Sequence, residues 1–268
     1  MNKKPKLPIE ALLEHLVKYK DAVIVLGPDI LEDNGQFAIS KETYECYNRK
    51  LMIKKPDEFW KYYSDNIMTP LAITNKTTKE IHSLLSMNIH STIIDTNIVK
   101  TISPNYKVVS PNGKNNVLQC VKCQKEYDAH SMFNQLQDQQ TVLKCDCGGN
   151  IKPTVLYHGE KYSTPIYQSV KNAIFTEENG KPELNTHTLI FIGVDFTDSL
   201  ISELIDSYDA LKDYQHYTVI ITDKKNRDDL IYYNPEFGVT DDLNQALNRL
   251  INLIKEYATL DVNLLSLV

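Results

Sequence analysis

The sequence is poor in glycine, with 9 glycines among 268 residues, where a share of about 7% is usual. Any glycine-rich loop that holds a phosphate must therefore be built from very few residues. Long hydrophobic runs are also missing, because the longest, 22–26 and 189–194, fall far short of the roughly 18 residues that suggest a membrane span. The N-terminus has neither the apolar core nor the small-residue cleavage site of a secretory signal. We therefore expect a soluble, cytoplasmic protein with no membrane partner.

Neither positive charge nor cysteine is abundant. The chain has 29 Lys+Arg against 35 Asp+Glu, a net charge of -6, which argues against a basic coat and predicts no nucleic-acid partner. Five cysteines are too few for a disulfide scaffold in a chain of this length. The length itself predicts one large domain or two small ones.

Short, β-branched apolar runs alternate with helical patterns along the chain. Such runs predict buried strands, and apolar residues at helical spacing predict helices between them. We expect strands at 21–26, 91–95, 106–109, 117–119, 154–157, 188–193 and 217–222, and helices at 8–20, 39–51, 56–64, 77–87, 198–212 and 240–257. This alternation predicts an α/β fold with a doubly wound parallel sheet.

Four of the five cysteines form two close pairs, Cys120 with Cys123 and Cys145 with Cys147. Thiolates are soft ligands that suit tetrahedral zinc, and two close pairs at this spacing are typical of a zinc ribbon. Four protein ligands leave no open position, so we expect a structural Zn²⁺ rather than a catalytic one. Free thiols, or a redox pair at Cys120 and Cys123, are the alternative. Cys46 stands alone, and we assign it a structural role.

The segment that begins at the last of these cysteines, 147–160, reads Cys-Gly-Gly-Asn-Ile-Lys-Pro-Thr-Val-Leu-Tyr-His-Gly-Glu. It resembles the sirtuins, in which the last ribbon cysteine leads into Gly-Gly-x-x-x-Pro-x-Val-x-x-Phe-Gly-Glu. Four further segments are similar to sirtuin motifs in the same order along the chain. These are the strand and glycine turn at 22–30, the Pro-x-x-Phe-Trp helix at 55–60, Thr-Gln-Asn-Ile-Asp at 94–98, and the strand before Gly-Thr-Ser at 191–193.

The resemblance implies a Rossmann-like large domain with an inserted small domain, the latter combining a zinc ribbon with a helical module. The large domain would comprise 1–30, 70–118 and 151–268, the helical insertion 31–69, and the ribbon 119–150. NAD would lie in the cleft between the two domains.

Sirtuins use NAD to remove acyl groups from lysine or, in some members, to transfer ADP-ribose, with a histidine as general base on a ribose hydroxyl. The resemblance therefore implies a protein or acyl-lysine peptide as the partner. The residues it assigns to the cofactor are Gly27, Asn97, Ile98 and Gly193.

The general base is the first departure from the family pattern. The sirtuin histidine precedes a glycine about eight residues before the first zinc cysteine, and Asn112-Gly113 occupies that place. An amide does not titrate near neutral pH, so Asn112 cannot act as a general base. His158 replaces the family's phenylalanine before Gly159-Glu160. It is either a substitute base or a histidine without a catalytic role.

The phosphate loop is the second departure, because Gly-Ala-Gly becomes Gly27-Pro28-Asp29. Pro28 has no amide hydrogen to donate to a phosphate. Asp29 would set a carboxylate beside the diphosphate, at a repulsion of roughly 3–4 kcal/mol per charge pair at about 4–5 Å and an effective dielectric near 20. Asp195, in the segment that replaces Gly-Thr-Ser, adds a second negative charge.

The losses fall on cofactor and catalytic positions, whereas the zinc ligands and the strands are retained. This pattern favours a degenerate sirtuin, a zinc-stabilised scaffold or binding protein with weak or no NAD binding and turnover. The alternative is an active but atypical sirtuin, a deacylase or ADP-ribosyltransferase with a rearranged site. A zinc-ribbon adaptor or nucleic-acid binder fits poorly with the acidic composition and the extensive strand pattern.

Overall fold

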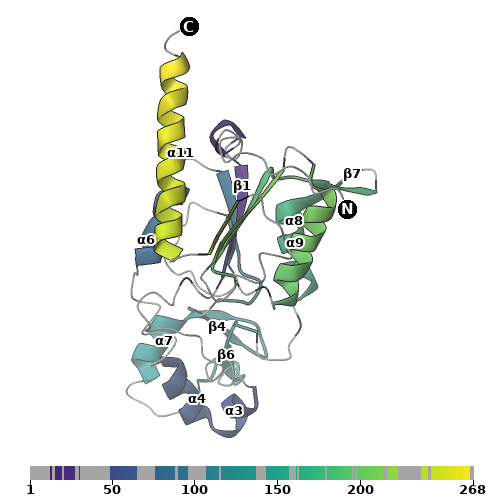
Figure 1. The fold of residues 1–268 in the computed structure, drawn as a ribbon. Coiled ribbons are helices and arrows are strands. Elements are labelled where there is room, and N and C mark those ends of the chain that lie inside the picture. The colour runs from purple at the N-terminus through teal and green to yellow at the C-terminus, as the bar shows by residue number, and fades with distance from the viewer. Residues whose placement is uncertain are drawn as a thin grey trace.

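A six-stranded parallel sheet forms the centre of the molecule in the computed structural model (Figure 1). The strands are β1 (Asp21–Leu26), β2 (His90–Asp95), β3 (Lys107–Val109), β9 (Thr188–Ile192), β10 (Tyr217–Thr222) and β11 (Phe237–Thr240), in the order β11-β10-β9-β1-β2-β3. β1 pairs with β2 on one side and β9 on the other, so that Ile24 lies between Ile93 and Ile190. The predicted Rossmann-like sheet is confirmed, because the strand order reverses between β1 and β9.

The structure describes most, but not all, of the chain. The described residues are 13, 16–19, 21–27, 30, 49–64, 76–87, 90–95, 107–114, 116–136, 143–156, 161, 163–178, 180–194, 196, 198–213, 216–222, 237–240 and 243–265.

Helices cover both faces of the sheet (Figure 1). One face carries α6 (Lys76–Leu85) and α11 (Leu243–Leu265), and the other carries α8 (Thr164–Ile174) and α9 (Ser199–Leu211). Side chains of β1 alternate between the two cores, since Ile24 and Leu26 pack with α11 whereas Val23 and Val25 pack with α8 and α9. A strand buried on both faces has no polar side, which explains its continuous apolar run.

A smaller unit lies beyond the carboxyl-terminal edge of the sheet (Figure 1). It contains the antiparallel strands β5 (Glu126–Asp128), β4 (Val117–Cys120) and β6 (Ile151–Pro153), together with α3 (Arg49–Lys54), α4 (Pro56–Tyr63) and α7 (Ala129–Leu136). Phe59, Trp60 and Tyr63 of α4 share one apolar core with Leu118 and Ile151 of the strands. The helical segment and the cysteine ribbon therefore pack as one unit, although the boundaries 31–69 and 119–150 stay predictions.

The strand predicted at 154–157 is wrong over its described residues, 154–156. The strand lies earlier, at β6, because Ile151 pairs with Cys120 and Pro153 pairs with Leu118. The chain then bends at Thr154, whose hydroxyl donates to the Lys114 carbonyl at 2.9 Å and accepts from the Lys114 N–H at 3.0 Å. The Thr154 N–H still donates to the Val117 carbonyl of β4 at 3.0 Å, and the pairing with β4 ends there.

Several further elements differ from the sequence predictions. The helices α7 and α8 and the strands β5 and β11 were not predicted, nor was the antiparallel hairpin of β7 (Phe175–Glu178) and β8 (Lys181–Leu184), and α11 extends past the expected end at 257 to Leu265. The helix expected at 39–51 lies largely outside the described residues. Across the ranges given above, no helix is both long enough and apolar enough to cross a membrane.

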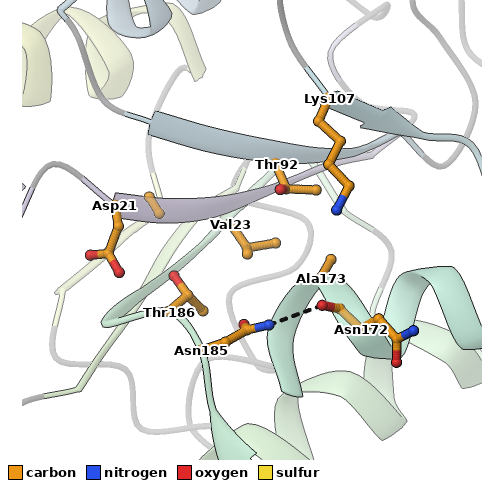
Figure 2. Close-up of a pocket in the computed structure, with 9 residues that line it drawn as sticks. Asp21, Val23, Thr92, Lys107, Asn172, Ala173, Asn185 and Thr186 are labelled. Atoms are coloured by element: carbon orange, nitrogen blue, oxygen red, sulfur yellow. Dashed lines mark hydrogen bonds between the residues drawn. The ribbon is translucent and has the colours of Figure 1, made fainter. Parts of the chain in front are cut away.

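A cavity of about 180 Å³ lies at the amino-terminal edge of the sheet, between β1–β3 and α8 (Figure 2). It is lined by Asp21, Ala22, Val23, Thr92, Lys107, Asn172, Ala173, Asn185 and Thr186.

Candidate functional site

Two glycines meet at the carboxyl ends of β1 and β9. The Gly27 N–H donates to the Ile192 carbonyl at 2.9 Å, and the Gly193 N–H donates to the Ile221 carbonyl at 2.8 Å. A β-carbon on Gly27 would lie 2.1 Å from the Gly193 oxygen, so no larger residue fits there. In open parallel sheets, ligands bind at this edge, where the strand order reverses. The two glycines therefore mark the candidate cofactor cleft, but their own amides bond within the protein.

Asn112 lies in a tight turn after the carboxyl end of β3, at the same sheet edge as the two glycines. The Gly113 N–H donates to the Ser110 carbonyl at 3.1 Å, and the Leu156 N–H donates to the Asn112 carbonyl at 2.9 Å. Gly113 has a φ of 84°, and a β-carbon there would lie 2.2 Å from the Thr154 carbonyl oxygen. This packing holds the turn, and with it Asn112, against the chain that leaves the cysteine ribbon.

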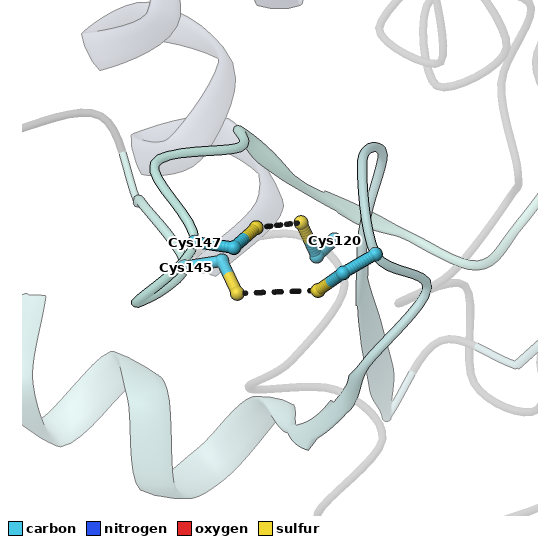
Figure 3. Close-up of side chains that lie close together, drawn as sticks. Cys120, Cys145 and Cys147 are labelled. Atoms are coloured by element: carbon cyan, nitrogen blue, oxygen red, sulfur yellow. Dashed lines mark hydrogen bonds between the residues drawn. The ribbon is translucent and has the colours of Figure 1, made fainter.

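The four predicted cysteine ligands come together on the smaller unit (Figure 3). The Sγ atoms of Cys120 and Cys147 are 3.5 Å apart, and those of Cys123 and Cys145 are also 3.5 Å apart. All four sulfurs lie within 4.8 Å of one another. A tetrahedral zinc ion with Zn–S bonds of about 2.3 Å separates its sulfurs by about 3.8 Å. The cluster therefore has the composition and size of a structural zinc site.

The thiols of this cluster differ in acidity. A backbone hydrogen bond from Cys147, together with the Tyr127 hydroxyl, lowers the pKa of Cys145 to about 6. A backbone hydrogen bond from Lys125 lowers the pKa of Cys123, but the neighbouring Cys147 and Cys145 thiols outweigh it and raise that pKa to about 12. Because zinc ligands are thiolates, metal binding at this cluster releases the protons that the thiols hold.

Two supporting contacts of the cluster were not predicted. The Tyr127 hydroxyl donates to Cys145 Sγ at 2.9 Å, and outer hydrogen bonds of this kind orient metal ligands. A β-carbon on Gly149 would lie 2.6 Å from Cys120 Sγ, so this glycine allows the two halves of the cluster to approach. Tyr127 has no distinguishing sequence pattern, and only the pairing of β4 with β5 brings it to the cysteines.

The structure brings together only some of the predicted site residues. The four cysteines form one cluster, and the glycines at 27 and 193 are in contact. Asn97, Ile98 and His158 lie outside the described residues, as do Pro28 and Asp29. The assignments of these five residues stay predictions.

Comparison with known proteins identifies a family over the smaller unit and part of the sheet. The profile of the Sir2 family matches residues 33–178, just over half of the chain. The NAD-dependent protein deacetylase of Sulfolobus acidocaldarius is 25% identical over 123 residues, which cover 45% of this chain and 48% of that protein. The NAD-dependent protein deacetylase of Sulfurisphaera tokodaii is 27% identical over 143 residues, covering 52% and 55%. The chain thus spans about half the length of these curated relatives.

Solved structures match over more of the chain. A Sir2 homologue in complex with NAD superposes with a TM-score of 0.71 at 15% identity, covering 93% of this chain and 94% of that one. Sir2Tm bound to a propionylated peptide gives a TM-score of 0.69 at 17% identity, covering 92% and 98%. At these identities the likeness shows that the fold is shared.

Proposed function

Because the chain belongs to the Sir2 family, we propose that it is a homologue of NAD-dependent protein deacylases whose catalysis is impaired, and that it acts as a zinc-stabilised scaffold or binding protein. The observation that carries the proposal is Asn112, in the turn after β3, at the position that the sirtuin motif gives to its general base. The cytoplasmic location and the domain boundaries belong to the same proposal.

The missing base accounts for one part of the expected loss. In the family, NAD supplies the ribose hydroxyl from which the base takes a proton. The Asn112 side chain can donate and accept hydrogen bonds, but it neither takes up nor releases a proton near pH 7. Loss of a positioned base lowers a rate by about 10²–10⁴.

The backbone at the carboxyl ends of β1 and β9 accounts for the other part of the expected loss of activity. The N–H groups of Gly27 and Gly193 both donate to carbonyls of the sheet, so neither is free for a diphosphate. Pro28, the next residue, has no amide hydrogen, and Asp29 is an anion. Anion sites depend on free backbone donors and positive potential, so these residues fit NAD poorly.

The cysteine cluster supports a role that does not need turnover. Its four sulfurs lie within 4.8 Å of one another, and Cys120 and Cys145 belong to the core that joins α4 to the strands. A bound zinc ion would stabilise this unit whether or not a cofactor is present. By analogy with Sir2Tm bound to a propionylated peptide, we propose a protein or acyl-lysine peptide as the partner.

Calorimetric titration with NAD tests the proposal. We expect no saturable heat below roughly 1 mM NAD, a dissociation constant that corresponds to about -4 kcal/mol. A saturable isotherm in the tens of micromolar would contradict impaired cofactor binding. It would favour an active, atypical NAD-dependent deacylase or ADP-ribosyltransferase instead.

Two variants separate the loss of the general base from the loss of the diphosphate-binding residues. Asn112→His alone is expected not to restore nicotinamide release or loss of acyl-lysine, because a base returns at most about 10²–10⁴ in rate and adds no phosphate donor. The triple variant Asn112→His, Pro28→Ala, Asp29→Gly is expected to be required for recovery. Clear turnover by the single variant would refute the inference that Pro28 and Asp29 prevent diphosphate binding. Turnover by the unmodified chain that His158→Ala abolishes would show that another base acts.

A further inference from the structure

The cavity at the amino-terminal edge of the sheet interrupts an otherwise apolar face. Strand pairing sets Val23, Thr92 and Lys107 side by side across β1, β2 and β3. Farther along the same strands and on the same face, the side chains are apolar and pack against α8 and α9. At the cavity, the half-buried Thr92 and the exposed Lys107 stand at these positions instead, with the exposed Asn172 and Asn185 opposite them (Figure 2).

A fixed negative charge stands at one end of this cavity. Asp21 Oδ2 accepts from the His187 backbone N–H at 3.3 Å and lies 2.9 Å from His187 Nδ1. Asp21 Oδ1 is shielded from solvent and has no hydrogen-bond partner within the described part of the chain. These contacts hold the carboxylate in place, and because Oδ1 is shielded, a cation approaches Asp21 through Oδ2.

A positive charge from Lys107 enters the cavity from the other side (Figure 2). Two strand spacings and two residues separate Asp21 from Lys107, which puts their Cα atoms about 12 Å apart. The structure records no ion pair between them over the residues it describes. The cavity therefore presents opposite charges at separate ends, with the Thr92 hydroxyl between them.

We propose that this cavity binds a small zwitterion, an amino acid whose ammonium group faces Asp21 and whose carboxylate faces Lys107 and Thr92. A ligand with one charge would match one end and be repelled at the other. A volume of about 180 Å³ equals about six water molecules at about 30 Å³ each. Because the two charged side chains start far apart, β- and γ-amino acids such as β-alanine and γ-aminobutyrate fit better than glycine.

This site is separate from the cofactor cleft. Asp21 begins β1 and Gly27 follows its other end, so six residue steps of a strand, about 20 Å, lie between them. The proposal does not rest on NAD binding, and a failure of the proposed function leaves it standing. We expect NAD and ADP-ribose not to compete with the zwitterion.

Ligand-observed NMR and calorimetry on the full chain test the site, with β-alanine and γ-aminobutyrate as probes and propionate and propylamine as single-charge controls. We expect saturable binding of the zwitterions that is at least about tenfold tighter than that of either control. Lys107→Met should weaken binding at least about tenfold and Thr92→Val several-fold. Lys79→Met removes an equal charge from an exposed position on α6 and should leave the affinity unchanged.

Three outcomes would overturn the proposal. One is the absence of saturation by either zwitterion up to about 50 mM, far above millimolar affinity. Another is propionate binding as tightly as β-alanine, which would make the cavity an anion site. The third is unchanged affinity in both Lys107→Met and Thr92→Val, provided that their thermal melts match that of the unmodified chain.

Discussion

Adding one methyl group at Gly149 is expected to disable the zinc site. A β-carbon there would lie 2.6 Å from Cys120 Sγ and 2.7 Å from Lys122 Cβ. To reach an ordinary contact of 3.4 Å, the sulfur must move from 2.6 Å by about 0.8 Å, whereas zinc–ligand distances hold within about 0.2 Å. The backbone resists movement because the Cys145 N–H donates to the Gly149 carbonyl at 2.8 Å. We therefore expect Gly149→Ala to lower zinc affinity at least about 100-fold.

The neighbouring glycine provides a matched control. Gly148 has a φ of 76° and nothing within 4 Å of an added β-carbon, so Gly148→Ala introduces backbone strain of about 1 kcal/mol and no clash. It should retain about one zinc ion per chain and unfold at a slightly lower temperature than the unmodified chain.

Zinc content after purification without chelator, followed by competition with a chromophoric chelator, measures both variants. The reasoning fails if Gly149→Ala keeps its zinc with unchanged affinity, or if Gly148→Ala loses the metal to the same extent.

Two further predictions concern hydrogen bonds away from the metal. Thr154→Val removes both bonds between Thr154 and Lys114 and should speed hydrogen exchange of the Lys114 amide about tenfold, whereas Thr154→Ser should not; equal exchange in both variants would contradict the role of the hydroxyl. The Tyr167 hydroxyl and then Lys171 lower the pKa of the half-exposed Glu203. A carboxyl whose pKa is lowered in the folded state stabilises the fold at pH values above its usual pKa. This stabilisation is lost as the pH falls through the lowered pKa. Glu203→Gln should therefore destabilise by about 0.5 kcal/mol at pH 7 and by nothing at pH 2, and a difference independent of pH would refute the assignment.

Local patterns sufficed for five of the six strands of the sheet, all but β11, and for the metal ligands. The runs at 22–26 and 219–221 are apolar throughout because both sheet faces are buried, and that property is visible in the sequence. The metal ligands could be identified equally well, because a structural zinc site of four thiolates draws its ligands from two pairs, each at short spacing.

Other elements depended on partners distant in the sequence. The run at 154–157 has strand-like residues, but the strand is β6, because β4 offers its hydrogen bonds to Ile151–Pro153. The hairpin of β7 and β8 could have been found, since Asn179-Gly180 between them is a turn signal that the charged flanks obscured.

The sequence by itself determined that this chain forms a parallel α/β sheet and carries four cysteines suited to one metal ion, because residue identity and spacing carry that information. It also predicts an asparagine, Asn112, at the position of the sirtuin base. Only the tertiary structure decided how the sites are built. The Gly27 and Gly193 amides donate to carbonyls of the sheet, and the Thr154 side chain bonds to the Lys114 backbone beside the Asn112 turn. The groups in each of these bonds are far apart in the sequence. The charged cavity likewise exists because strand register sets Lys107 and Thr92 on one face with Asp21, and register is a property of the assembled sheet.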